Sequence, residues 1–183
     1  MTSLYHAALQ DLAGVFNRID HDAVERAVAE IAAADQLALY GVGREGLQIK
    51  GFAMRLFHLG RKVAVVGDMN SPHLGKGGLL IVSAGPGYLS TVASLMEVAK
   101  RDGARTLVVT ALPDGVCARA ADVVLPIPAQ TMVDDSGPGV SVLPMGSLFE
   151  GGQYILFEIM ILMLREKLGV KAEAMRARHT NLE

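Results

Sequence analysis

The sequence predicts an α/β fold built on a parallel sheet of five strands, and three observations support this prediction. Five short apolar runs recur between residues 37 and 127, and each has the length of one buried strand. Stretches with helical spacing of apolar residues separate most of these runs. Two of the connections are rich in glycine and lead from a strand into a helix. Such alternation of strand and helix is typical of parallel sheets with right-handed crossovers.

The predicted elements follow from the periodicity of apolar residues. Residues 4–19 have helical spacing, and a second helix is expected to follow to about residue 34, with Asp22 and Glu25 as capping residues. The five runs predict strands buried on both faces, at residues 37–41, 63–67, 79–84, 106–111 and 122–127. Helices are expected between the strands, at residues 46–58, 89–101 and 114–120, with a short one near 71–75.

The C-terminal third begins with a long loop over residues 128–147 and continues as a helix over 148–168. That helix is apolar almost all round, so we expect burial on both sides. One domain covers only one side, and a partner subunit is therefore expected to cover the other. A last helix begins near Lys171. We find no linker or repeat, and expect one domain over 1–183, with N-terminal helices (1–34) and a C-terminal helical tail (148–183).

Composition excludes several classes of protein. With 183 residues and 51% apolar residues, the chain suits one globular domain with a full core. Its net charge of −2 and lack of basic clusters argue against nucleic-acid binding. The single cysteine, Cys117, excludes an internal disulfide and fits a reducing cytoplasm. No signal peptide is recognised, and the apolar stretch 155–164 is too short to span a bilayer. We expect a cytoplasmic protein without membrane or nucleic-acid partners.

The first glycine-rich turn, Gly41-Val42-Gly43-Arg44-Glu45-Gly46, has the G-x-G-x-x-G spacing of a dinucleotide fingerprint. The second is "SAGPGYLST" at residues 83–91. Both lead into a helix N-terminus at the edge where open parallel sheets bind ligands, so a phosphate is favoured there. NAD also requires an acidic residue at the end of the second strand, and Asp68 lies beyond that place. We therefore expect an anion site and no dinucleotide cofactor.

Several longer stretches carry a family resemblance: "GVGREG", "GFAMRLFHLG", "VAVVGD", "GPGYLSTV", "GSLFE" and the terminal "RHTNLE". Together they resemble the 6-phospho-3-hexuloisomerases of the sugar isomerase (SIS) domain superfamily, over about residues 5–183. The resemblance implies a three-layer α-β-α sandwich with a five-stranded parallel sheet, usually in a tetramer. It implies interconversion of 3-hexulose 6-phosphate and fructose 6-phosphate through an enediol, without a metal or nucleotide.

The two turns depart from the pattern of that family. Its first turn usually reads G-x-G-R-S-G, and here Glu45 replaces the serine. Its second turn usually reads S-G-S-G-E-T, and here residues 83–88 read S-A-G-P-G-Y. Two hydroxyl groups are lost, and a carboxylate stands where an anion is expected to bind. Ser90 and Thr91 are candidates to compensate. We expect the standard phosphohexulose to be converted poorly or to be replaced by a related substrate.

The resemblance implies that Glu150, at the start of the helix after "GSLF", is the catalytic base. From the residue alone, Glu150 could equally complement the positive end of its helix. His58 and His179 are two candidates for a proton relay, and the sequence does not separate them; capping of a helix end is the alternative for His58. No two histidines have the spacing of a zinc site, so no metal is expected.

The candidate substrate-binding residues all lie in or just after the two turns: Gly43, Arg44, Glu45, Ser83, Gly85, Gly87, Tyr88, Ser90 and Thr91. Arg55 lies one turn below, where a structural salt bridge is favoured. The expected ligand is a small sugar phosphate, and the expected assembly is a homodimer or homotetramer with a shared active site. The alternative function is a non-catalytic SIS module that binds a phosphosugar or another carbohydrate derivative.

Overall fold

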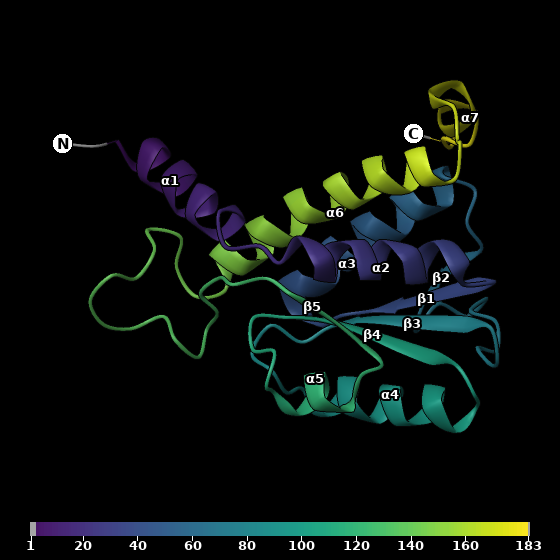
Figure 1. Ribbon diagram of the computed structural model, residues 1–183, viewed down its shortest axis with the longest axis horizontal. Coiled ribbons are helices and arrows are strands. Elements are labelled where there is room, and N and C mark those ends of the chain that lie inside the picture. The colour runs from purple at the N-terminus through teal and green to yellow at the C-terminus, as the bar shows by residue number, and fades with distance from the viewer. Residues whose placement is uncertain (1–2, 183) are drawn as a thin grey trace.

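A computed structural model of the chain describes residues 3–182 and has one five-stranded sheet in which neighbouring strands all pair in parallel (Figure 1). The strand order is β2-β1-β3-β4-β5. The strands are β1 Gln36–Tyr40, β2 Val63–Val65, β3 Gly78–Ser83, β4 Arg105–Thr110 and β5 Val123–Pro126. All five predicted strands are confirmed, and their ends agree to within two residues.

Helices cover both faces of the sheet, which confirms the three-layer sandwich (Figure 1). One face carries α4 Ser90–Arg101 and α5 Val116–Ala120. The other carries α2 His21–Ala33, α3 Gly43–His58 and α6 Ser147–Lys167. Along β3, Leu79 and Ile81 belong to the core beneath α3 and α6, while Leu80 and Val82 belong to the core beneath α4. The alternation of side chains along a strand therefore supplies both cores.

The remaining helices lie outside this sandwich. The N-terminal α1, Leu4–Phe16, extends beyond the sheet and packs against α6 (Figure 1). The short α7, Ala172–Ala177, packs against α3. The loop between β5 and α6 projects from the body of the domain on the same side as α1 (Figure 1). These segments add to the domain without extending the sheet.

Burial of the strands is less uniform than predicted. The inner strands β3 and β4 are almost entirely buried, but every residue of β2 is partly exposed and β5 alternates between buried and partly exposed positions. The prediction of burial on both faces is wrong for β2 and β5, because each lies at an edge of the sheet with a strand on one side only. Apolar composition alone does not distinguish an edge strand from a central one.

Two local predictions are also corrected. The N-cap of α2 is Asp20, whose Oδ1 accepts a hydrogen bond of 3.0 Å from the Ala23 N–H, so Asp22 and Glu25 do not cap it. A capping side chain must precede the helix to reach its free N–H groups. No helix forms over residues 71–75, where Pro72 and Gly75 leave too short a stretch for a stable turn.

Helix α6 runs beside α3 in the same direction. Arg44 pairs with Glu150 near the start of both helices, the rings of Phe52 and Phe157 stack 4.2 Å apart, and Arg55 forms a two-pronged ion pair with Glu158. The expected structural salt bridge of Arg55 is confirmed.

By length and composition, the 21 residues of α6 would suffice to cross a membrane, contrary to the estimate from its shorter apolar run. Half of its most apolar window is buried inside the domain, so we interpret α6 as a core helix. We expected α6 to be buried on both sides, but within a single chain only one side is buried. On the other side, Tyr154 and Leu162 are more than half exposed.

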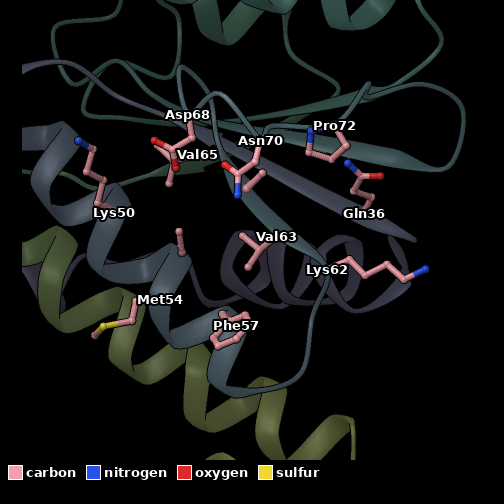
Figure 2. A pocket seen from close by; sticks show the side chains of 12 residues that line it. Gln36, Lys50, Met54, Phe57, Lys62, Val63, Val65, Asp68, Asn70 and Pro72 are labelled. Carbon is pink, nitrogen blue, oxygen red and sulfur yellow. The ribbon is translucent and has the colours of Figure 1, made fainter. Parts of the chain in front are cut away.

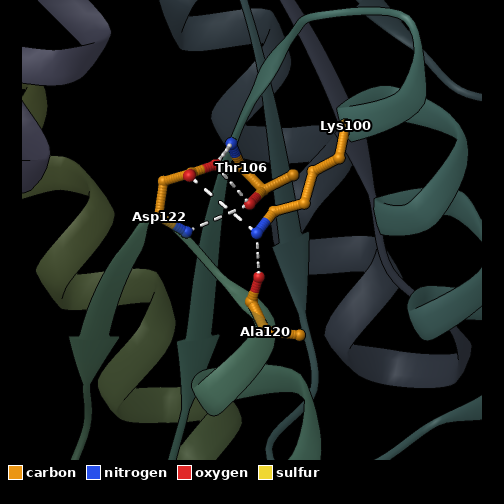
Figure 3. A network of polar contacts seen from close by, with 4 residues as sticks. All are labelled: Lys100, Thr106, Ala120 and Asp122. Carbon is orange, nitrogen blue, oxygen red and sulfur yellow. Dashed lines mark hydrogen bonds and ion pairs between the residues drawn. The ribbon is translucent and has the colours of Figure 1, made fainter.

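At the amino edge of the sheet, a polar network fixes the last strand to its neighbour (Figure 3). The Asp122 carboxylate accepts hydrogen bonds from the backbone N–H and the hydroxyl of Thr106, both at 2.8 Å. The Lys100 ammonium lies 3.9 Å from the same carboxylate and also donates to the carbonyl of Ala120. This network holds β5 in register with β4 before the chain continues toward the long loop.

Candidate functional site

The site lies where the strand order of the sheet reverses. The chain passes from β1 outward to β2, and then returns to place β3 on the other side of β1. The connections after β1 and β3 therefore diverge at the carboxyl edge, which is the usual ligand position in open α/β sheets, and we call this switch point the crevice. The two glycine-rich turns follow these two strands. They lie side by side because Tyr40, at the end of β1, pairs with Val82 near the end of β3. The tertiary structure thus brings both predicted turns together.

The glycines of the first turn have a packing reason. A Cβ atom on Gly46 would lie 2.5 Å from the carbonyl oxygen of Gly41, so strand and helix approach too closely there for any side chain. Gly43 begins α3 with a φ of 56°, a conformation that favours glycine. The G-x-G-x-x-G spacing is therefore accounted for by the tight turn itself.

Glu45 bridges the two turns. Its Oε2 accepts a hydrogen bond of 3.0 Å from the Gly85 N–H and a second one from the Ser83 hydroxyl. Burial raises the pKa of Glu45 above its ordinary value, and the hydrogen bonds from Ser83 and Gly85 offset this only in part. Three of the predicted binding residues thus already contact one another.

Gln153 was missed by the sequence analysis and belongs to the same group. It lies on α6, is fully buried, and donates from Nε2 to the Ser83 Oγ at 2.8 Å. Within residues 3–182 its Oε1 is buried without a hydrogen-bond partner. The signal that could have found it is an amide three residues after Glu150 in a helix that is otherwise apolar at its buried positions.

Glu150 lies in the first turn of α6 and faces the same crevice. Its Oε2 is 3.1 Å from the Nε of Arg44, and Arg44 also donates from Nη1 to the Ser147 hydroxyl at 2.8 Å. The Glu150 side chain is 13% exposed. Burial raises the pKa of Glu150, the positive charge of Arg44 lowers it, and the charge of Glu45 raises it further. Two carboxylates and one guanidinium therefore share the site.

The rest of the second turn is partly open to solvent. Gly87 has a φ of 82° and packs against Leu112 and Gly115. Tyr88 is exposed, and Ser90 and Thr91 lie exposed in the first turn of α4. A role of these hydroxyl groups in binding phosphate stays a prediction.

His58 and His179 lie together but far from Glu150. Their rings stack with centroids 5.3 Å apart, and Arg178 donates to the carbonyl of His58 at 3.0 Å. With a rise of 1.5 Å per residue, His58 is about 21 Å along α3 from Arg44. One subunit therefore holds the histidines and Glu150 at opposite ends of α3, and the proton-relay role stays a prediction. Glu183, at the end of the tail, lies outside the described residues.

A separate cavity of about 560 Å³ opens between α3 and the edge strand β2 (Figure 2). Lys50, Met54 and Phe57 face it from α3, and Asp68 and Asn70 approach from the loop after β2. None of the predicted site residues lines it. We place the functional site at the crevice instead, because the helix N-termini and the paired carboxylates converge there.

The sequence and the fold are both similar to those of known proteins. The family model of the SIS domain matches residues 30–150. The chain is 36% identical to a 3-hexulose-6-phosphate isomerase of Mycobacterium gastri over 173 residues, covering 94% of this chain and 86% of that one. It is 32% identical to a 3-hexulose-6-phosphate isomerase of Bacillus subtilis over 165 residues, covering 90% and 89%.

A solved structure from Methanococcus jannaschii, for which a molecular function of 3-hexulose-6-phosphate isomerase was inferred, superimposes with a TM-score of 0.81. The identity to that protein is 27%, and the superposition covers 98% of this chain and 97% of that one. The similarity therefore extends over the whole domain, including the helices outside the sheet.

Proposed function

This chain belongs to the SIS domain family, in the group that includes the 3-hexulose-6-phosphate isomerases, and from that premise we propose that it interconverts a 3-ketose phosphate and its 2-ketose isomer. The reference reaction is 3-hexulose 6-phosphate to fructose 6-phosphate. The observation that carries the proposal is the pairing of Glu150 with Arg44 at the mouth of the crevice.

The proposed reaction moves a carbonyl group from C3 to C2 through an enediol. Glu150 takes the proton from C2, exchanges it with solvent and delivers a proton to C3, while O2 loses a proton and O3 gains one. A base of this kind works best when its pKa is raised toward neutral pH, and burial acts on Glu150 in that direction. Arg44 offsets the negative charge that develops on the enediolate oxygens, since it is the cation nearest the base.

We further propose a homotetramer in which two subunits complete each site. Exposed apolar side chains line the outer surfaces of α3 and α6: Leu47, Phe57, Tyr154 and Leu162. Exposed apolar patches of this kind commonly mark subunit interfaces. A neighbouring subunit would bring His58 and His179 to the crevice that holds Glu150. The single cysteine is buried, which is consistent with the cytoplasmic location we propose.

The experiment is an assay that couples fructose 6-phosphate formation from 3-hexulose 6-phosphate to a dehydrogenase signal. Run in D2O, the enediol mechanism predicts deuterium at C3 of the product, observed by NMR. Turnover without deuterium at C3 would contradict the role of a solvent-exchanging base. Tight binding of sugar phosphates without any turnover would instead support the non-catalytic sensing module.

A further inference from the structure

We propose that Glu45 determines substrate specificity by occupying the anion-binding donors of the second turn, so that it competes with the phosphate group of a ligand. The inference rests on the proposed function for the identity of the substrate. Its physical basis, the occupation of two convergent donors by a carboxylate of the chain itself, is independent of that function.

The backbone donors of residues 84–87, in the first half of the second turn, already have partners within the chain. The N–H of Ala84 donates to the carbonyl of Val109, and the N–H of Gly87 donates to the carbonyl of Ala84, both at 2.9 Å. Pro86 has no N–H. Over residues 84–87, this leaves the N–H of Gly85, which binds Glu45 at 3.0 Å. A ligand anion cannot bind through the backbone of residues 84–87 without displacing Glu45.

The second donor, the hydroxyl of Ser83, also binds the carboxylate of Glu45. Ser83 has one hydroxyl proton, and its oxygen accepts a hydrogen bond from Gln153 at 2.8 Å. That bond orients the hydroxyl so that its proton is donated to Glu45. Because Gln153 is fully buried on α6, the orientation is set by the core and not by solvent. Gln153 is therefore a positioning residue for the donor that Glu45 uses.

Gly85 leaves the space that the carboxylate needs. A Cβ atom at this position would lie 2.8 Å from the Oε1 of Glu45 and 3.0 Å from the ring of Phe149. The glutamate at 45 and the glycine at 85 are thus two parts of one arrangement, although 40 positions separate them in sequence. A side chain at position 85 and the carboxylate of Glu45 would therefore compete for the same volume.

Charge reinforces the competition. A phosphate that enters the crevice meets the carboxylates of Glu45 and Glu150, and the nearby cation Arg44 is already paired with Glu150. Like charges in a partly buried site repel strongly because the effective dielectric constant is low. A sugar hydroxyl, by contrast, can donate to Glu45. We therefore infer that Glu45 lowers the affinity for the phosphate group and favours a hydroxyl at the second turn.

The test is calorimetric titration with inorganic phosphate, fructose 6-phosphate and fructose. The variants are E45Q, which removes the charge and keeps the shape, and E45S, which also frees both donors. E97Q, an exposed glutamate on α4, is the matched control. We expect E45Q and E45S to bind both phosphate ligands at least tenfold more tightly than wild type. Affinity for fructose should not rise, and E97Q should behave as wild type.

Unchanged or weaker phosphate binding in both variants would overturn the inference. If E45S fails to fold, E45Q alone decides, because it removes the competing charge without opening a cavity. The proposed function fails separately, when wild type and E45S both lack isomerase turnover. If turnover is present, E45S should lower the KM for 3-hexulose 6-phosphate by tenfold or more, whereas a merely structural role would lower kcat and leave the phosphate titration unchanged.

Discussion

The two edges of the sheet hold carboxylates with similar donors and opposite electrostatics. At the amino edge, Asp122 accepts from the N–H and the hydroxyl of Thr106. At the carboxyl edge, Glu45 accepts from the N–H of Gly85 and the hydroxyl of Ser83. Burial works to raise the pKa of Asp122, but the bonds from Thr106 and the charges of Lys100 and Arg105 outweigh it, so the pKa lies below its ordinary value. The pKa of Glu45 is raised.

The difference lies in the surroundings and not in the hydrogen bonds. Asp122 is only partly buried and has cations near it, so its charge is stabilised in the folded state. Glu45 is more deeply buried and shares its site with the carboxylate of Glu150. Carboxylates whose pKa is raised by burial and by a neighbouring carboxylate cluster at functional sites. We therefore assign the amino-edge network to stability and the carboxyl-edge network to function.

The largest expected effect separates the two edges by turnover. E150Q should lower kcat by about 10²–10⁴-fold, because the amide cannot accept the carbon-bound proton. D122N, the same chemical change at the amino edge, should leave kcat within about twofold. Both are measured in the coupled isomerase assay, with circular dichroism to confirm the fold. Equal losses in the two variants would mean that the edges do not differ in function.

The C-terminal tail, which lies near the amino edge, is expected to take part in catalysis in the site of a neighbouring subunit. Deleting residues 178–183 removes His179 and should abolish turnover with a smaller effect on stability. Mixed and reassembled with E150Q, the deleted protein should regain part of the activity, because some sites then combine an intact Glu150 with an intact tail. No recovery on mixing, or sedimentation as a monomer at micromolar concentration, would contradict a shared site.

The stability of the amino edge should depend on Asp122. D122A leaves the two donors of Thr106 without their partner and should lower the free energy of unfolding by about 1–2 kcal/mol. Chemical denaturation at pH 7 measures this change. E97Q serves as a surface control and should change stability by less than about 0.5 kcal/mol. A D122A protein as stable as wild type would remove the structural role.

The pH dependence of stability should have opposite sign at the two carboxylates. The raised pKa of Glu45 means that its contribution is fully present below its ordinary pKa of 4.5 and is lost as pH rises through the folded-state value. E45Q does not titrate, so its stability relative to wild type should increase with pH above 4.5. The lowered pKa of Asp122 means that its contribution is present above 3.8 and is lost as pH falls through the folded-state value.

Denaturation of wild type, E45Q and D122N across this range tests both signs. Because the pKa of Glu150 is also raised, the E45Q comparison is repeated in an E150Q background. A gap between E45Q and wild type that stays constant with pH would show that Glu45 titrates as it does in the unfolded chain.

The smallest effect concerns the coupling between positions 45 and 85. G85A places a Cβ atom against Glu45 and Phe149 and should cost about 1–3 kcal/mol. In an E45S background part of that cost should vanish, giving a coupling energy of about 0.5–1 kcal/mol in a double-mutant cycle. The remainder is attributed to Phe149, which is unchanged. Additive effects would mean that the carboxylate does not occupy the space above Gly85.

The sequence alone determined the five strands, the main helices and the two glycine-rich turns. Local periodicity and turn residues carry that information, because they act over a few neighbouring positions. It also placed Glu45, Ser83 and Gly85 in the candidate site, since each lies in or beside a glycine-rich turn that follows a strand. The exposure of the edge strands β2 and β5 was not predictable in this way, because burial depends on which strands lie alongside.

The tertiary structure alone decided what those residues do to one another. The order β2-β1-β3-β4-β5 brings the turn after β1 against the turn after β3, and only then does Glu45 reach the donors of Ser83 and Gly85. Gln153 joins them because α6 packs beside α3. The same packing separates Glu150 from His58 by the length of a helix. Contacts between residues far apart in sequence set burial and charge, and these determine whether a carboxylate stabilises the fold or serves the site.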